Sequence, residues 1–201
     1  SRDAEQKKQL LRIAYTDELT GCYNYRWVMR LFEKDLSRSK RFFKQLTIAM
    51  VDLDYFKELN DTCGHIIGND VLCHFADIVQ KNIRAMDTLG RYGGEEFILL
   101  FPDTSPGDVV NILKRVREKV PEISVKVPAV IQYREGTIKF SAGIAAFPHN
   151  GDTVEALVSA ADNALYFAKR NGRDRFVVEA QNFTEKLISN KKQSLLKKLS
   201  Y

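Results

Sequence analysis

Two glycines and two adjacent carboxylates, Gly93, Gly94, Glu95 and Glu96, stand directly before an apolar run at residues 97–101. This pattern predicts a β-hairpin whose tip carries both acids. The glycines permit positive φ and leave no side chain at the tip, so a bulky ligand can lie against the backbone. Because adjacent strand residues point to opposite faces, the two glutamates are expected to have different roles. The alternative interpretation is a solvated polar turn without chemistry.

A second acidic pair, Asp52 and Asp54, follows the apolar strand-like run at residues 46–51. Carboxylates at this place suit a hard divalent cation, which prefers oxygen ligands. Residues 55–61 predict a short helix whose free N–H groups could receive a phosphate, and Lys57 adds a positive charge. Metal, phosphate and lysine together indicate a nucleoside triphosphate site. Helix capping is the alternative role of the aspartates, although a cap needs only one of them.

Several motifs in a fixed order resemble the GGDEF domain family of diguanylate cyclases, over about residues 15 to 178. The matching stretches are D-E-L-T-G at 17–21 with Asn24, D-L-D-Y-F-K-E-L-N-D at 52–61 with Gly64-His65, the signature in its G-G-E-E-F form at 93–97, S-A-G-I-A at 141–145, and A-D-N-A-L-Y-F-A-K at 161–169 with Gly172-Arg173. The ordered set is far more specific than the G-G-E-E-F run alone.

The resemblance implies an α/β (α+β) fold in which helices wrap a central, mostly antiparallel sheet, similar to the palm of nucleotide cyclases and polymerases. Periodicity alone predicts only mixed α and β structure. We expect a GGDEF domain at residues 15–179, an N-terminal linker or signalling helix at 1–14, and a C-terminal basic helix at 180–201. That last segment resembles the linker of GGDEF–EAL multidomain proteins, which suggests excision from a longer chain. A simple terminal helix packed on the domain is the alternative.

The activity implied by the resemblance joins two GTP molecules into cyclic di-GMP and releases two pyrophosphates. Each domain of a homodimer supplies one GTP, and two Mg²⁺ (or Mn²⁺) ions are expected in each active half-site. The expected metal ligands are Asp52, the backbone carbonyl of Leu53, Glu95 and Glu96. The expected catalytic residues are Glu95 as proton acceptor, Lys57 as charge stabiliser and Glu96 as helper. The expected substrate-binding residues are Tyr55, Phe56, Lys57, Asn60, His65, Asn69, Lys169 and Arg173.

Lys169 and Arg173 are expected to grip the β- and γ-phosphates. They are four residues apart, so they would share a face if one helix contained both. An ordinary basic pair on the surface is the alternative.

One position departs from the family pattern. The family reads the guanine edge with an Asn at the position of Asn60 and an Asp at the position of Asn69. A carboxylate accepts from both guanine N–H groups, whereas an amide presents one acceptor and one donor group. Three outcomes follow: GTP is used with weaker affinity, ATP is also accepted, or catalysis is lost and the domain serves as a regulatory GTP- or cyclic-di-GMP-binding module. The first is favoured because the acids and Lys57 are present.

A further motif, Arg84-x-x-Asp87, precedes the predicted hairpin. At this place the family has an inhibitory site for the product, and Arg115 falls where a supporting arginine is found. Arginine pairs with guanine or phosphate, and aspartate accepts from guanine N–H groups. A solvated Arg–Asp pair is the alternative.

Charge and composition argue against a nucleic-acid-binding protein and a membrane-spanning protein. The net charge of +5 is concentrated at the two ends of the chain, so the central domain lacks the basic excess of a nucleic-acid binder. No segment predicts a membrane span or a signal peptide, so no direct membrane insertion is expected. Cys22, Cys63 and Cys73 have no metal-type spacing and suggest reduced thiols. We therefore expect a cytoplasmic domain, although its parent protein could be membrane-tethered.

Periodicity and turn residues predict the order of elements. The expected helices are 2–14, 25–43, 55–61, a long helix that follows Gly68 and runs to about Arg84, 106–120 and 152–170. The expected strands are 46–53, a hairpin at 88–101, a pair at 129–147 turning near Glu135-Gly136, and 175–179. The expected inward faces of two helices are Trp27, Val28, Leu31, Phe32 and Leu36, and Val109, Ile112, Leu113, Val116 and Val120.

Overall fold

A five-stranded sheet forms the centre of the computed structural model, which describes residues 6, 13–120 and 138–180. The strand order is β2-β3-β1-β4-β5, and every neighbouring pair is antiparallel except β4 and β5, which are parallel. The elements are α2 (Tyr25–Phe42), β1 (Leu46–Leu53), α3 (Phe56–Cys63), α4 (His65–Asn82), β2 (Thr88–Gly93), β3 (Glu96–Pro102), α5 (Pro106–Lys119), β4 (Phe140–Phe147), α6 (Val154–Arg170) and β5 (Phe176–Val178). The expected α/β fold with a mostly antiparallel sheet is confirmed.

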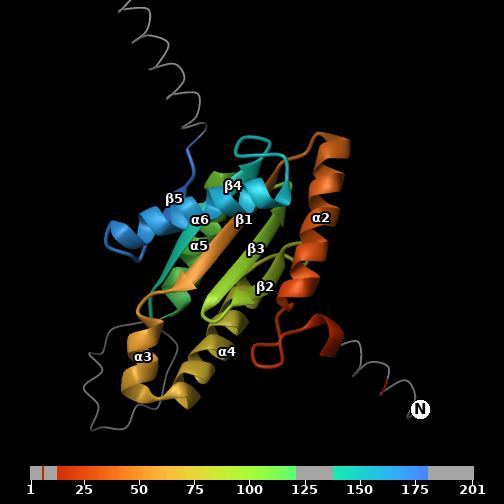
Figure 1. Cartoon of the computed structure of the whole chain (residues 1–201). Coiled ribbons are helices and arrows are strands. Elements are labelled where there is room, and N and C mark those ends of the chain that lie inside the picture. The colour runs from red at the N-terminus through yellow and green to blue at the C-terminus, as the bar shows by residue number, and fades with distance from the viewer. Residues whose placement is uncertain (1–5, 7–12, 121–137, 181–201) are drawn as a thin grey trace, which may run out of the picture.

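Helices cover both faces of the sheet (Figure 1). The central strand β1 is buried along its whole length, and its side chains alternate between two apolar clusters. Ala49, Val51 and Leu53 pack with α4 and α5, whereas Ile48 and Met50 pack with α2 and α6. The carboxyl end of β1 is therefore held from both sides.

Close contact between α6 and β4 depends on Gly143. A Cβ atom at this position would run into the backbone of α6 at Ala161 and Leu165. Glycine therefore lets the helix lie directly on the strand. Because β4 pairs with β1, this contact brings the last turn of α6, which contains Lys169, close to the end of β1.

Side-chain caps fix where three helices begin. Asn24 accepts a hydrogen bond from the backbone N–H of Trp27 at the start of α2. Ser105 and Thr153 cap α5 and α6 in the same way. Such caps satisfy N–H groups that the helix itself leaves unpaired.

The predicted helices and strands agree with the structure, apart from one helix start. Helix α4 begins at His65 and not after Gly68, because Gly64, with φ of 83°, separates it from α3. Gly68 lies inside α4, where the side chain of Asn60 packs against it and leaves no room for a Cβ atom. The predicted inward faces are buried, although Trp27 and Leu31 are only partly so.

Several predictions fall on other parts of the chain. The helices at 2–14 and 180–201 and the first strand of the 129–147 pair lie outside the described residues, apart from a few positions at their edges. The division into three segments stays a prediction. In the part that the structure describes, no helix has both the length and the apolar character needed to cross a bilayer.

Candidate active site

The end of β1 and the β2–β3 turn bring the predicted metal ligands together. Asp52 lies directly opposite Glu96 in the β1–β3 ladder, and the backbone N–H of Leu53 donates to the carbonyl of Glu95 over 3.4 Å. Glu95 belongs to the turn, since β3 begins at Glu96. The expectation of opposite strand faces therefore does not apply, and both glutamates act electrostatically on Asp52.

The carboxylate of Asp52 forms an ion pair with the ammonium of Lys169. Burial raises the pKa of the Asp52 carboxyl to about 6, the Lys169 ammonium opposes this rise, and Glu95 and Glu96 add to it. The Lys169 Nζ atom lies 2.7 Å from Asp52 Oδ2, and Asp52 is 5% exposed. A predicted phosphate ligand is thus paired with a predicted metal ligand.

The donors at this end of the sheet suit a hard cation. Carboxylate oxygens and a backbone carbonyl are the ligands that Mg²⁺ and Mn²⁺ prefer. Within residues 13–120 and 138–180, however, no three Asp, Glu, His or Cys side chains form a ready-made metal site. The chemistry of the donors fits a divalent ion, and one oxygen of Asp52 is paired with Lys169 in this structure.

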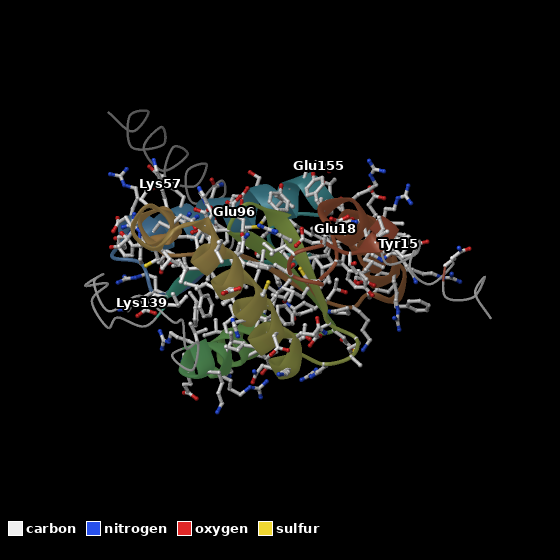
Figure 2. All side chains as sticks on the ribbon, turned by 90° about the horizontal axis from the view of Figure 1, so that it is seen from below. Tyr15, Glu18, Lys57, Glu96, Lys139 and Glu155 are labelled. Carbon is white, nitrogen blue, oxygen red and sulfur yellow. The ribbon has the colours of Figure 1, made fainter. Side chains whose placement is uncertain are left out.

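The predicted phosphate ligands approach from three segments. Lys57 is exposed on α3. Figure 2 labels Lys57 and Glu96 in a view from below Figure 1, toward the end of the domain that carries α3 and α4. Helix α6 ends at Arg170, so Lys169 and Arg173 do not share a helical face. Arg173 instead lies in the following turn, with its guanidinium carbon 4.6 Å from the centre of the Tyr55 ring.

The predicted base-reading residues lie on α3 and α4. Asn60 Oδ1 is buried and has no hydrogen-bond partner, which is expensive unless a donor arrives. His65 and Asn69 are exposed on the first turns of α4. The side chain of Phe56 is 7% exposed and belongs to the core, and its predicted role in substrate binding stays a prediction.

Asp54 was predicted to bind a cation or to cap a helix, and its contacts in the structure are different. Residue 55 precedes α3 without a side-chain cap, so capping by Asp54 is wrong. The Asp54 carboxylate instead accepts from Ser141 Oγ and from the backbone N–H of Asp174. No local sequence pattern indicates this contact, because Ser141 and Asp54 are 87 residues apart.

A second overlooked contact holds the hairpin tip. The Arg91 guanidinium donates to Asp17 Oδ1 over 3.0 Å and to the carbonyl of Gly94 over 2.8 Å. Burial alone would raise the pKa of Asp17, but hydrogen bonds from Thr20 and Arg91 leave it below its ordinary value. Neither Gly93 nor Gly94 adopts positive φ. The tip is shaped by Arg91 and not by left-handed glycines.

The predicted inhibitory residues also lie together. The backbone N–H of Arg84 donates to Asp87 Oδ2 over 2.8 Å, and Arg115 donates to the carbonyl of Asn82 over 3.3 Å. Asp87 is buried, which raises its pKa, and its Oδ1 atom has no partner. The carboxylate thus shapes the turn through the backbone, while the Arg84 side chain is exposed.

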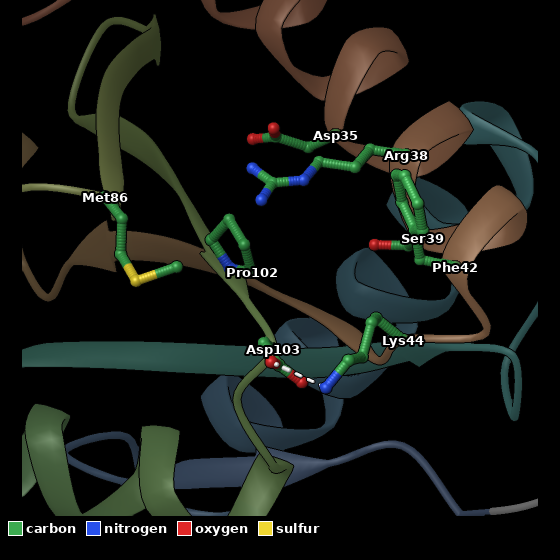
Figure 3. Close-up of a pocket in the computed structure, with 8 residues that line it drawn as sticks. All are labelled: Asp35, Arg38, Ser39, Phe42, Lys44, Met86, Pro102 and Asp103. Carbon is green, nitrogen blue, oxygen red and sulfur yellow. Dashed lines mark hydrogen bonds and ion pairs between the residues drawn. The ribbon is translucent and has the colours of Figure 1, made fainter.

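A cavity of about 330 Å³ lies beyond this turn, between the end of α2 and the end of β3 (Figure 3). Its walls are Asp35, Arg38, Ser39, Phe42, Lys44, Met86, Pro102 and Asp103. Lys44 and Asp103 form an ion pair of 3.1 Å across one side. The lining contains none of the predicted metal or substrate ligands, so this hollow is separate from the carboxylate cluster.

Comparisons with known proteins identify the family of this chain. Residues 14–175 match the family model described as "Diguanylate cyclase, GGDEF domain". The response regulator PleD of Caulobacter vibrioides is 38% identical over 170 residues, which is 85% of this chain and 37% of PleD. The diguanylate cyclase DgcP of Pseudomonas aeruginosa is 39% identical over 165 residues, or 82% of this chain and 24% of DgcP.

Solved structures agree as well. The coiled coil and GGDEF domain of DgcB from Caulobacter crescentus, in complex with c-di-GMP, superposes with a TM-score of 0.78 at 29% identity, covering 88% of this chain and 92% of that one. The chain spans well under half the length of the curated relatives it matches. The match to the family model nevertheless covers most of its residues, and the chain belongs to the GGDEF domain family of diguanylate cyclases.

Proposed function

We propose that the protein is a diguanylate cyclase that condenses two GTP molecules into cyclic di-GMP. The observation that carries this proposal is the meeting of Asp52, Glu95 and Glu96 beside Lys169 at the end of β1. The names of two relatives, the diguanylate cyclases DgcP and DosC, support the same activity. Consumption of GTP and the absence of disulfides among Cys22, Cys63 and Cys73 fit a cytoplasmic location.

Each 3′-hydroxyl attacks the α-phosphorus of the other nucleotide. An O3′–P bond forms, the bond to the β-phosphate oxygen breaks, and pyrophosphate leaves. Glu95 takes the hydroxyl proton, while Lys57, Lys169 and Arg173 offset the negative charge of the phosphates. Glu96 helps to orient the attacking group.

Two Mg²⁺ or Mn²⁺ ions would be held by Asp52, the carbonyl of Leu53, Glu95 and Glu96. When bound, such ions neutralise phosphate charge and favour deprotonation of the hydroxyl. The pairing of β1 with β3 brings these carboxylates together where β1 ends.

The reaction needs two copies of the chain. One set of carboxylates and one set of phosphate ligands bind one GTP, and the second nucleotide must come from a facing domain. Product formation should therefore rise more steeply than linearly with protein concentration wherever the dimer is dilute.

The guanine edge is read by Asn60 and Asn69. Asn60 Oδ1 is a buried acceptor without a partner, which suits a donor on the base. Asn69 adds one acceptor and one donor group where a carboxylate would accept twice. We expect GTP to be used with reduced affinity and ATP to be excluded less strictly. Loss of catalysis, leaving a regulatory nucleotide-binding module, is the alternative function that Asn69 favours.

The product also regulates the enzyme. Asp87 is buried and holds the 84–87 turn that carries the exposed Arg84 side chain, and Arg115 donates to the neighbouring carbonyl of Asn82. A homologous GGDEF domain, that of DgcB, has been solved in complex with c-di-GMP. The exposed Arg84 guanidinium can pair with guanine or phosphate.

Pyrophosphate release from GTP and Mg²⁺ tests the proposal. Glu95→Gln keeps the shape of the side chain but cannot accept the proton, so we expect a loss of about 100-fold or more in turnover. Glu33→Gln, an exposed change on α2, is the matched control and should turn over like the wild type. Wild-type turnover in the Glu95→Gln variant would remove the assigned role, and no turnover by the wild-type dimer would contradict the proposed activity.

A further inference from the structure

Asp54 uses both carboxylate oxygens to join two segments that are far apart in the sequence. Ser141 Oγ lies 2.9 Å from Oδ1 and 3.1 Å from Oδ2, and the backbone N–H of Asp174 donates to Oδ2 over 2.9 Å. Asp54 itself is 8% exposed. A buried carboxylate that accepts several hydrogen bonds forms a strong and well-directed contact.

The segment that Asp54 holds is a turn of unusual backbone shape. Arg173 and Asp174 follow one another with φ of 57° and 48°, in the left-handed region that disfavours L-residues. Each such residue costs roughly 1 kcal/mol or more, so the surrounding structure must fix the turn. The backbone N–H of Arg173 donates to the carbonyl of Ala168 over 3.1 Å, which holds only one side of it.

Other contacts to this turn are weaker. Lys139 Nζ lies 3.2 Å from Asp174 Oδ2, and the Arg117 guanidinium lies 4.0 Å from Asp174 Oδ1. Both cations are about half exposed, and ion pairs of that kind contribute little. The Arg117 guanidinium also donates to the Asp174 carbonyl over 3.4 Å, at an exposed place. The hydrogen bond of 2.9 Å from the Asp174 N–H to Asp54 is shorter and partly buried, so it holds the backbone at residue 174 more firmly than these contacts do.

The turn places the side chain of Arg173 against Tyr55, the residue that follows Asp54. The Arg173 guanidinium lies over the ring of Tyr55, at a distance suited to a cation–π contact. Asp54 thus acts at both ends of this contact: its carboxylate holds the turn behind Arg173, and its backbone precedes the Tyr55 ring. Loss of the Asp54 carboxylate would keep the Arg173 guanidinium in the protein but would no longer fix its position.

We infer that Asp54 is a positioning residue for nucleotide binding, which holds Arg173 where it meets the triphosphate. The inference rests on the proposed function, since it assigns Arg173 to the phosphates. The inference gives Asp54 no contact of its own with the base or the reacting atoms, because its carboxylate already accepts from Ser141 and from the Asp174 N–H. Its removal should weaken contacts to the β- and γ-phosphates and leave contacts to the base intact.

Calorimetric titration with a non-hydrolysable GTP analogue and with GMP, both with Mg²⁺, tests this inference. We expect Asp54→Ala to weaken the triphosphate about tenfold, because a charged hydrogen-bonding group is no longer held in place. The affinity for GMP, which lacks these phosphates, should not change. In turnover assays the same variant should raise KM more than it lowers kcat.

A double-mutant cycle separates positioning from general damage. If Asp54 acts through Arg173, then Asp54→Ala should cause no further loss of triphosphate affinity in the Arg173→Ala background. Asp54→Asn can still accept from the Asp174 N–H and should recover most of the affinity. Where Asp54→Ala does not fold, as judged by circular dichroism, Ser141→Ala replaces it, with an expected loss of about threefold for one hydrogen bond.

Four results would overturn the inference: unchanged triphosphate affinity in Asp54→Ala or its replacement, equal losses for GMP and the triphosphate, multiplying losses in the double variant, or no recovery with Asp54→Asn. If the wild type binds the triphosphate and forms product, and the Asp54 variant binds it equally well, only the role of Asp54 is contradicted. A wild type that binds no guanine nucleotide defeats the proposed function as well.

Discussion

The ammonium of Lys169 lies 2.7 Å from Asp52 Oδ2, so the last turn of α6 neutralises the carboxylate at the end of β1. Asp52 is the first predicted metal ligand, and Lys169 is a predicted phosphate ligand. In the proposed site, a divalent ion beside Asp52 would compete with the ammonium of Lys169 for one carboxylate. Nucleotide phosphates offer Lys169 another partner, which links nucleotide binding to metal binding.

Replacement of Lys169 by Met tests this competition. Without a neighbouring positive charge, Asp52 should attract a divalent ion more strongly, and we expect about five- to tenfold tighter Mn²⁺ binding in the nucleotide-free protein. The same variant should bind GTP more weakly. Electron paramagnetic resonance of free Mn²⁺ measures the first effect directly. Lys34→Met, an exposed change on α2, is the control, and Mn²⁺ affinity equal to that of the wild type in Lys169→Met would contradict the account.

The raised pKa of Asp52 predicts a specific dependence of stability on pH. The folded state holds this proton up to about pH 6, whereas the unfolded chain releases it near its ordinary value of 3.8. The stabilisation from the protonated form is thus complete below 3.8 and is lost as pH rises through about 6. Asp52→Asn imitates the protonated form, so it should raise the melting temperature at pH 8 in metal-free buffer.

The advantage of Asp52→Asn should shrink as pH falls and vanish near pH 4. A shift of about two pKa units corresponds to at most roughly 3 kcal/mol, which amounts to several degrees for a domain of this size. Thermal melts with EDTA at pH 4, 6 and 8 supply the measurement. An Asp52→Asn protein that is less stable than the wild type at pH 8, or equally stabilised at all three pH values, would show that burial does not govern this carboxyl.

Periodicity and turn residues predicted most of the fold, because β1, α2, α5 and α6 have long and unambiguous patterns. The start of α4 was misplaced, since a glycine usually breaks a helix and the sequence does not show that Gly68 makes room for Asn60. A contact between two distant segments leaves no local pattern.

The candidate site was predicted in its residue types and less well in its contacts. Different roles were expected for Glu95 and Glu96 because adjacent strand residues alternate in direction, but Glu95 lies in the turn and only Glu96 lies in β3. The pairing of Lys169 with Asp52 and of Asp54 with residue 174 depends on where α6 ends and on the backbone beyond it. Those features follow from packing on β4, and motif spacing does not reveal them.

Base choice should respond to Asn69. Asn69→Asp supplies the second acceptor for the guanine edge, so we expect KM for GTP to fall about tenfold and discrimination against ATP to increase. Asp70→Asn, at the neighbouring exposed position of α4, changes the charge on a different side of the helix and serves as the control. Steady-state kinetics with each nucleotide measure the effect, and equal GTP and ATP preference in wild type and Asn69→Asp would refute the role of this position.

Product inhibition should depend on the side chain of Arg84. Its backbone N–H holds Asp87, so Arg84→Ala keeps the turn and removes only the guanidinium. The concentration of cyclic di-GMP that halves the rate should rise about tenfold or more. Inhibition curves for the wild type, for Arg84→Ala and for the exposed control Arg30→Ala measure this, and an unshifted curve for Arg84→Ala would remove the inhibitory site.

The most direct test of the central claim is mass spectrometry of the products formed with Mg²⁺ and GTP, ATP or both. The account predicts cyclic di-GMP from GTP, a smaller amount of mixed or adenine product when ATP is present, and none from the Glu95→Gln variant. Absence of any cyclic dinucleotide from the wild-type dimer, at concentrations where GTP is bound, would contradict it and leave a regulatory nucleotide-binding domain.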